Sequence, residues 1–264
     1  MQALTEFLPV SSSGHLALAE HLLGLGEIGL SFDVDVHVGT LGAVFVFLRN
    51  QLRALLAALG KAVADLRTGV PIATIYRDSA DVRIAVLTVV ATIPTGLIGL
   101  GLESRIESTL RGPAAVGGML LVTAVVLLAT TRVPRGNRTE ADLTLRDALL
   151  VGVVQGFAVV PGISRAGSTS AIGLVAGLRP ETAARFSFLL SIPAILGAMV
   201  LQLRDLGDIS PEMARACLVG GIVSMVVGWG ALIGLLRVVR AGKLHWFAPY
   251  LIVVGCTAVI GSLI

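Results

Sequence analysis

The sequence predicts an all-α integral membrane protein, and three observations support this class. Apolar residues make up 55% of the 264 residues and charged residues only 14%, and the mean hydropathy is +0.90. A soluble chain of this length could not solvate itself with so few charges. The apolar residues form runs long enough to span a bilayer, which takes roughly 17–25 residues. Short basic loops separate these runs, so the pI of about 9.3 reflects membrane topology and not nucleic-acid binding.

Six segments have the length and hydropathy of transmembrane helices: 32–48, 84–102, 113–131, 186–202, 214–236 and 246–264. Arg and Lys are concentrated in three loops, 49–83, 132–146 and 237–243. The positive-inside rule places these loops in the cytoplasm, and it places the balanced or acid-leaning segments 103–111 and 204–215 outside. Residues 52–66 are amphipathic at helical spacing and are predicted to form a helix on the cytoplasmic membrane surface.

A polar motif occurs twice and aligns without a gap. The first copy, QALTEFLPVSSSGH, spans residues 2–15, and the second, QGFAVVPGISRAGS, spans residues 155–168. The alignment pairs Gln2 with Gln155, Ser11 with Ser164, Ser12 with Arg165 and Gly14 with Gly167. One copy carries a carboxylate and an imidazole, Glu6 and His15, and the other carries the guanidinium of Arg165. Copies with complementary charges predict one composite site at the interface between the repeats.

The loop assignments require each motif segment to enter the membrane and return to the same side. Residues 148–178 must begin and end on the cytoplasmic side, and residues 1–25 must begin and end outside. We therefore predict two re-entrant helical hairpins, each followed by three transmembrane helices, in an inverted-topology repeat. The chain is then a single membrane domain, 1–264, with repeat one at 1–131 and repeat two at 148–264. The two hairpin tips should meet near the midplane, surrounded by protein or a wet cavity.

The tips contain the groups that bind anions. Helices are expected to begin near His15 and Ser168, so that their amino-terminal N–H groups converge on the space between the tips. The planar fork of Arg165 and the neighbouring hydroxyls suit phosphate or pyrophosphate. The predicted substrate-binding residues are Gln2, Ser11, Ser13, Ser164, Gly167, Ser168 and Thr169. A lone serine at such a position is more often a helix cap.

Four residues are predicted to be catalytic: Glu6, Ser12, His15 and Arg165. Glu6 and Arg165 are ionisable groups in membrane-embedded segments, which makes them functional candidates, with a structural ion pair as the alternative. His15 lies three residues after Ser12, close enough to take a proton from a serine nucleophile that attacks phosphorus. Direct attack by water is the alternative. His37 could line the cavity or pack as a hydrogen-bonded residue, and the sequence favours neither.

The motifs TEFLPVSSSGH and PGISRAGST, together with ATIPTGLIGLGL and FSFLLSIPAILGA, resemble those of the bacterial undecaprenyl-diphosphate phosphatases associated with bacitracin resistance. The resemblance spans the whole chain. It implies hydrolysis of undecaprenyl diphosphate to undecaprenyl phosphate and inorganic phosphate, which recycles the lipid carrier of cell-wall synthesis, in the bacterial cytoplasmic (inner) membrane. By motif position it implies roles for Glu6, Ser12, His15, Ser164, Arg165 and Thr169.

The resemblance also implies a divalent cation, magnesium or calcium, with Glu6 as a ligand. Some members of the family have a second acid where this chain has Gln2, which weakens the case for a two-carboxylate metal site here. Relatives also have an apolar segment before the first motif, so we expect either that the first half of hairpin one is truncated or that Met1 is not the native start. The expected partners are a polyprenyl diphosphate and the membrane, without nucleic acid and with a homodimer as a candidate assembly.

The alternative function is a polyprenyl-phosphate transporter or flippase, because inverted repeats with broken helices are typical of transporters. A transporter needs no nucleophile with an adjacent base, which Ser12 and His15 offer. The sequence therefore favours the phosphatase.

Overall fold

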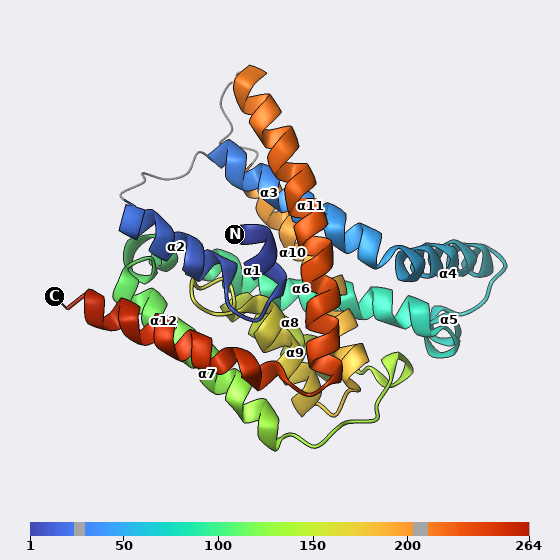
Figure 1. Ribbon diagram of the computed structural model, residues 1–264. Coiled ribbons are helices and arrows are strands. Elements are labelled where there is room, and N and C mark those ends of the chain that lie inside the picture. Colours follow the sequence, from blue (N-terminus) through green and yellow to red (C-terminus); the bar gives the residue numbers. More distant parts are fainter. Residues whose placement is uncertain (24–29, 203–210, 264) are drawn as a thin grey trace.

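The structure, a computed structural model, describes residues 1–23, 30–202 and 211–263 (Figure 1). These residues form helices joined by loops and include no β-strand, although one isolated bridge joins Arg138 to Leu178. The predicted all-α class is therefore confirmed for the described part of the chain. Residues 24–25 of the first predicted hairpin, 204–210 of a predicted outer loop and residue 264 lie outside it.

Five described helices are long and apolar enough to cross a membrane: α6 (Ala80–Arg105), α7 (Pro113–Ala129), α10 (Pro180–Gln202), α11 (Pro211–Arg240) and α12 (Ala248–Gly261). A sixth candidate combines α3 (Leu30–Phe47) with α4 (Arg49–Arg67), whose axes are bent by 75°. Each of the six predicted spans overlaps one of these helices. The chain is therefore a multi-pass membrane protein.

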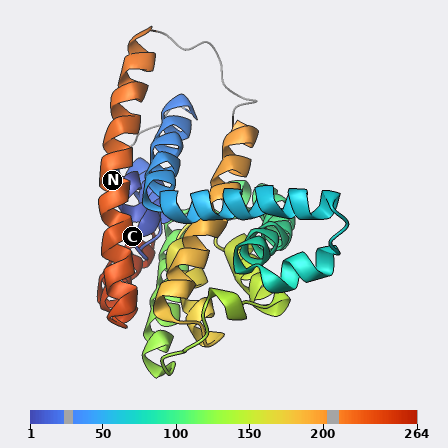
Figure 2. The ribbon, with the colours of Figure 1, turned by 90° about the vertical axis from the view of Figure 1, so that its right-hand side faces the viewer.

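The predicted amphipathic helix is α4, which leaves α3 at a steep angle and lies beside α5 (Ile72–Asp78) and α6 (Figure 2). The chain then turns back through α5. Ala62 of α4 packs with Ile75 and Val82 in a small apolar cluster separate from the main core. Several other apolar residues of α4 are exposed, namely Leu56, Leu59, Val63 and Leu66. An exposed apolar stripe on a charged helix suits a position on the membrane surface.

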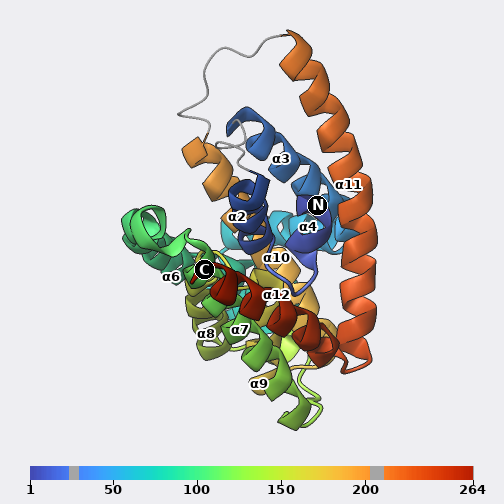
Figure 3. The same cartoon turned by 60° about the vertical axis from the view of Figure 1, so that its left-hand side comes forward.

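Long helices from the two halves of the chain pack against each other. α3 lies along α11, and α7 lies along α12 (Figures 1 and 3). The α7–α12 contact is closest at two glycines: a Cβ on Gly117 would lie 2.7 Å from the Gly255 carbonyl oxygen, and one on Gly255 would lie 2.8 Å from that of Gly117. Small residues allow such close approach of helices in lipid.

The remaining helices are short. Four of them form the two motif segments: α1 (Gln2–Phe7), α2 (Ser12–Leu23), α8 (Leu145–Phe157) and α9 (Arg165–Val175). The others are single turns: η1 (Ile106–Leu110), η2 (Thr130–Arg132), η3 (Glu140–Asp142) and η5 (Leu244–Phe247). The main core, which includes Phe7, Leu120 and Phe188, surrounds the motif segments and holds them between the long helices.

Candidate active site

Each motif folds as a helix, a loop and a second helix, with equivalent helix caps. The Ser11 hydroxyl oxygen accepts the Gly14 N–H at 3.3 Å, and the Ser164 hydroxyl oxygen accepts the Gly167 N–H at 3.2 Å. A serine cap satisfies one of the free N–H groups at a helix start. Because of these caps α2 begins at Ser12 and α9 at Arg165, earlier than the predicted starts near His15 and Ser168.

The two motif loops touch at Ser11, which is buried. Its hydroxyl oxygen also accepts the N–H of Gly162 in the second loop, at 3.1 Å. Ser11 has φ of 67°, a left-handed conformation that is costly for a residue with a side chain and that clusters at functional sites. A Cβ on Gly14 would lie 2.8 Å from the Gly162 nitrogen, and one on Gly167 would lie 2.9 Å from the Pro9 Cβ. The two loops therefore approach each other as closely as glycine permits.

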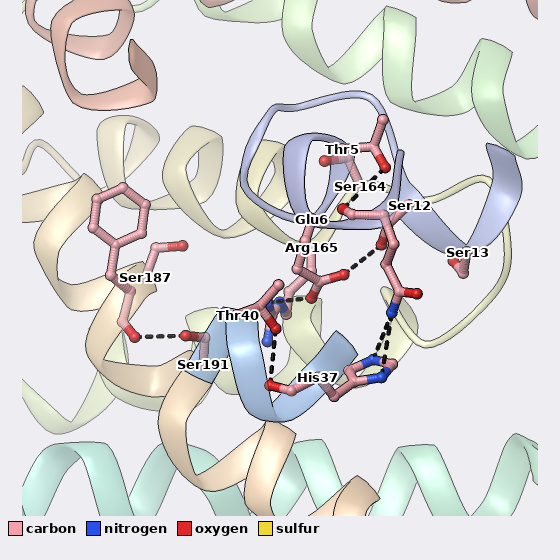
Figure 4. Close-up of polar contacts among 12 residues, drawn as sticks. Thr5, Glu6, Ser12, Ser13, His37, Thr40, Ser164, Arg165, Ser187 and Ser191 are labelled. Atoms are coloured by element: carbon pink, nitrogen blue, oxygen red, sulfur yellow. Dashed lines mark hydrogen bonds and ion pairs between the residues drawn. The ribbon is translucent and has the colours of Figure 1, made fainter. Parts of the chain in front are cut away.

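Glu6 of the first motif forms hydrogen bonds with residues of both motifs (Figure 4). Its Oε1 accepts a hydrogen bond from Arg165 Nη2 at 2.6 Å, and its Oε2 accepts one from the Ser12 hydroxyl at 2.5 Å. The Glu6 side chain is 10% exposed and that of Arg165 is 16% exposed, so removing either would leave a poorly solvated charge. A carboxylate in contact with a hydroxyl can accept its proton, and a guanidinium has further N–H donors for a phosphate.

A cavity of about 190 Å³ opens beside this cluster. Its polar lining comprises Thr5, Glu6, Ser11, Ser12, Ser13, His37, Thr95, Gln155, Ser164 and Arg165. Its apolar lining includes Val159 and Ile163 from the second loop and Ile195 from α10. The cavity therefore has donors for a phosphate and a wall that suits a hydrocarbon.

His15 is turned away from the Ser12 hydroxyl. Its Nδ1 lies 2.8 Å from the Ser11 carbonyl oxygen and its Nε2 lies 2.7 Å from the Tyr250 hydroxyl. The imidazole also stacks on the Tyr250 ring, with centroids 5.6 Å apart. Side chains on a helix point back toward its amino terminus, so His15 meets the carbonyl four residues earlier. The role of His15 as the base stays a prediction, and in this arrangement Glu6 is the group in contact with the Ser12 hydroxyl.

The predicted substrate-binding residues divide into two sets. Ser11, Ser13 and Ser164 line the cavity. The side-chain amide of Gln2 lies 3.2 Å from the ring of the lining residue His37. The second set, Gly167, Ser168 and Thr169, is buried within α9 and is not among the described lining residues. The Thr169 hydroxyl donates to the Arg165 carbonyl oxygen and also lies 2.5 Å from the Ser187 hydroxyl.

Four polar lining residues were not predicted as site residues: Thr5, His37, Thr95 and Gln155. Gln155 had a signal in the sequence, because the repeat aligns it with Gln2. Its Nε2 donates to the Leu190 carbonyl oxygen at 3.3 Å. Thr95 gave no signal, because a threonine in a membrane helix commonly bonds to backbone, and its hydroxyl indeed donates to the Gly152 carbonyl oxygen at 2.8 Å.

The described lining offers one carboxylate to a divalent cation, and its two oxygens already accept hydrogen bonds from Ser12 and Arg165. Glu6 is the only Asp or Glu in the described lining, and the described part of the chain contains no cluster of three or more His, Cys, Asp or Glu side chains arranged for a metal. Magnesium is commonly held by one or two carboxylates together with substrate phosphates and water. Glu6 can supply that carboxylate.

The fold and the site define a multi-pass helical membrane protein with a serine, a carboxylate and an arginine in one anion-compatible cavity. The chain belongs to the bacitracin resistance protein BacA family, whose sequence model matches residues 1–257. The predicted resemblance is therefore confirmed.

Several similar proteins carry the name undecaprenyl-diphosphatase. One from Desulforapulum autotrophicum is 41% identical, over 100% of this chain and 96% of that protein. One from Desulfatibacillum aliphaticivorans is 42% identical, with the same two coverages. One from Methanosphaera stadtmanae is 42% identical over 100% of this chain and 95% of that protein.

Proposed function

We propose that this protein is a membrane phosphatase that hydrolyses undecaprenyl diphosphate to undecaprenyl phosphate and inorganic phosphate. The cluster of Glu6, Ser12 and Arg165 carries the proposal, because it combines a hydroxyl, a proton acceptor and a phosphate-binding cation in one cavity. The family and the full-length similarity to proteins named undecaprenyl-diphosphatase support the same activity. They give no support to the transporter alternative.

In the proposed reaction Ser12 is the nucleophile. Its Oγ attacks the terminal phosphorus while its proton passes to Glu6 Oε2, and the bond from that phosphorus to the bridging oxygen breaks. Undecaprenyl phosphate leaves, and water then hydrolyses the phosphoserine to release inorganic phosphate. Arg165 stabilises the negative charge that develops on the phosphoryl oxygens. A divalent cation held by Glu6 and the substrate phosphates would add to that stabilisation.

The inverted-topology repeat belongs to the same proposal, with re-entrant hairpins at the two motifs and a location in the bacterial inner membrane. Two observations support it: Gly117 and Gly255 lie against each other, and Ser11 and Ser164 cap equivalent helices, with the Ser11 hydroxyl also bound to the Gly162 N–H of the second loop. Cysteines replacing Asn137 and Ala241 should be protected from an impermeant thiol reagent applied outside, whereas a cysteine replacing Gly112 should be labelled. Labelling at Asn137 would contradict this topology. A homodimer stays a candidate assembly.

The activity is tested with purified protein in detergent and a polyprenyl diphosphate. Wild-type protein should release inorganic phosphate, a chelator should lower the rate, and Ser12→Ala should be nearly inactive. Substrate that remains intact with the wild-type protein, with or without added magnesium or calcium, would contradict the proposed activity. Release by Ser12→Ala at the wild-type rate would instead identify water as the nucleophile.

A further inference from the structure

A second cavity lies where the ends of α7, α9 and α11 meet the beginning of α12. Its volume is about 250 Å³, and its lining includes Arg135, Leu174, Gly242 and His245. It shares no lining residue with the cavity beside Glu6. Leu174 lies about 14 Å along α9 from Arg165, at 1.5 Å per residue. The second cavity is therefore a separate place on the molecule.

The chain segments that enclose this cavity are strongly cationic. Residues 130–136 and 237–245 contain five Arg and Lys residues and no acid. The fold brings these two segments together, since η2 contacts η5. One of the five, Arg240, is 3.3 Å from Glu181 in an ion pair. Bringing the other cations together costs electrostatic free energy, which an anion between them would offset.

Two of the lining groups are available to such an anion. The Arg135 guanidinium has no hydrogen bond or ion pair within the described residues, and its Nη2 would lie 3.9 Å from a Cβ on Gly242 at the cavity. His245 Nδ1 is buried and has no hydrogen-bond partner in that same part of the chain. A buried polar atom without a partner is costly, so a ligand that pairs with it is favoured.

The neighbouring helix end does not need these cations. The last carbonyls of α11 accept hydrogen bonds from its own turn, with Gly242 N–H bound to Val239 O at 3.0 Å and Lys243 N–H bound to Val238 O at 3.0 Å. The Lys243 ammonium lies 3.9 Å from the centre of the Trp246 ring, which is 61% exposed. An exposed tryptophan beside a lysine at the start of a membrane helix is typical of the level of the lipid head groups.

We propose that this cavity binds a phosphate group, with the Arg135 fork and the N–H of His245 Nδ1 as donors. The ligand is a phosphate at the head-group level, supplied by an anionic phospholipid or as free inorganic phosphate. Basic pockets between membrane helices bind lipid head groups by this chemistry. The site goes beyond the proposed phosphatase activity, since it uses none of the residues of the first cavity.

The test measures lipid binding to the full-length protein by native mass spectrometry and its thermal unfolding in detergent. The probes are phosphatidylglycerol, phosphatidylcholine and inorganic phosphate. The variants are Arg135→Ala and His245→Ala, and the matched control is Arg132→Ala, an exposed cation of the same segment outside the cavity lining. Wild type and Arg132→Ala should retain phosphatidylglycerol, and Arg135→Ala and His245→Ala should bind it at least about tenfold more weakly.

Competition identifies the source of the phosphate. If inorganic phosphate at millimolar concentration stabilises the wild type and displaces phosphatidylglycerol, the site takes a free phosphate. If only phosphatidylglycerol stabilises it, the site takes a lipid head group. Either result supports the proposal, provided that the stabilisation is lost in Arg135→Ala. Equal stabilisation by phosphatidylcholine, or equal phosphatidylglycerol binding by wild type, Arg135→Ala and His245→Ala, would overturn it whether or not the protein releases phosphate from a diphosphate.

Discussion

The two motif segments share a backbone arrangement and differ in chemistry. In each, a serine caps the second helix, Ser11 in one and Ser164 in the other. The residue after the cap is Ser12 in the first segment and Arg165 in the second, and both contact the same carboxylate, Glu6. In the proposed reaction, this one difference between equivalent positions divides a symmetrical scaffold into a segment that supplies the nucleophile and a segment that binds charge.

The surroundings of the two segments differ as well. In α9 the residues from Ala166 to Ala171 are all buried, and the preceding helix α8 is anchored by an ion pair of 2.5 Å between Arg138 and Asp147. In α2 only Gly14 is buried. The helix after the Ser164 cap is therefore more deeply buried than the helix after the Ser11 cap, which packs on the core through the partly buried Ala17 and Leu18.

The largest effect is expected from removing the charge-binding group. Arg165→Ala should abolish turnover and weaken substrate binding by on the order of 2–5 kcal/mol, because a desolvated partner of the diphosphate is lost. Arg165→Lys should recover little, since an ammonium lacks the planar fork. Equilibrium binding and phosphate release measure the two effects, with circular dichroism as the control for folding. If Arg165→Ala bound the substrate with wild-type affinity, the second motif segment would have no role in substrate binding.

An intermediate effect is expected at His15, which supports the tip from the Ser11 carbonyl. His15→Ala should lower kcat by about 10–100-fold with little change in KM, because Ser12 is then poorly positioned. The rate should still fall at low pH in His15→Ala, as it does in the wild type. The reason is that the group in contact with the Ser12 hydroxyl is Glu6 and not His15. If the fall in rate at low pH disappeared in His15→Ala, His15 would be the base, as its spacing predicts.

A smaller effect is expected where the two loops touch. Gly14→Ala places a methyl group 2.8 Å from the backbone of Gly162, and overpacking of this kind typically costs about 1–3 kcal/mol of stability. Gly118→Ala is the matched control, because a Cβ there has nothing within 4 Å. The unfolding temperature and the turnover rate should both fall in Gly14→Ala and stay near the wild-type values in Gly118→Ala. Equal values for both variants would mean that the tip contact is unimportant.

The sequence predicts the parts of this site that follow from local rules. The gapless alignment pairs Ser11 with Ser164, and the structure shows both as caps of equivalent helices. The rarity of ionisable groups in membrane segments identifies Glu6 and Arg165, which form an ion pair. The six apolar runs likewise overlap the long helices of the structure.

The parts that escape prediction depend on side-chain direction and on contacts between distant segments. Spacing brings His15 near Ser12 along the chain, but the helix directs its ring back to Ser11, where Tyr250 of α12 stacks on it. Nothing in the first motif indicates that partner, which lies at the other end of the sequence. For His37 the sequence leaves cavity lining and hydrogen-bonded packing open, and the packing of α3 places it in the lining.

The most direct test of the divided site is a double-mutant cycle between Glu6→Gln and Ser12→Ala, measured as kcat and kcat/KM for phosphate release. In the proposed reaction the Ser12 proton passes to Glu6, so the two residues should act as one unit. Each single variant should lose roughly a hundredfold or more in kcat, with substrate binding nearly intact for Ser12→Ala. The double variant should be scarcely slower than the slower single variant. Fully additive losses would contradict the account, because Glu6 and Ser12 would then contribute independently.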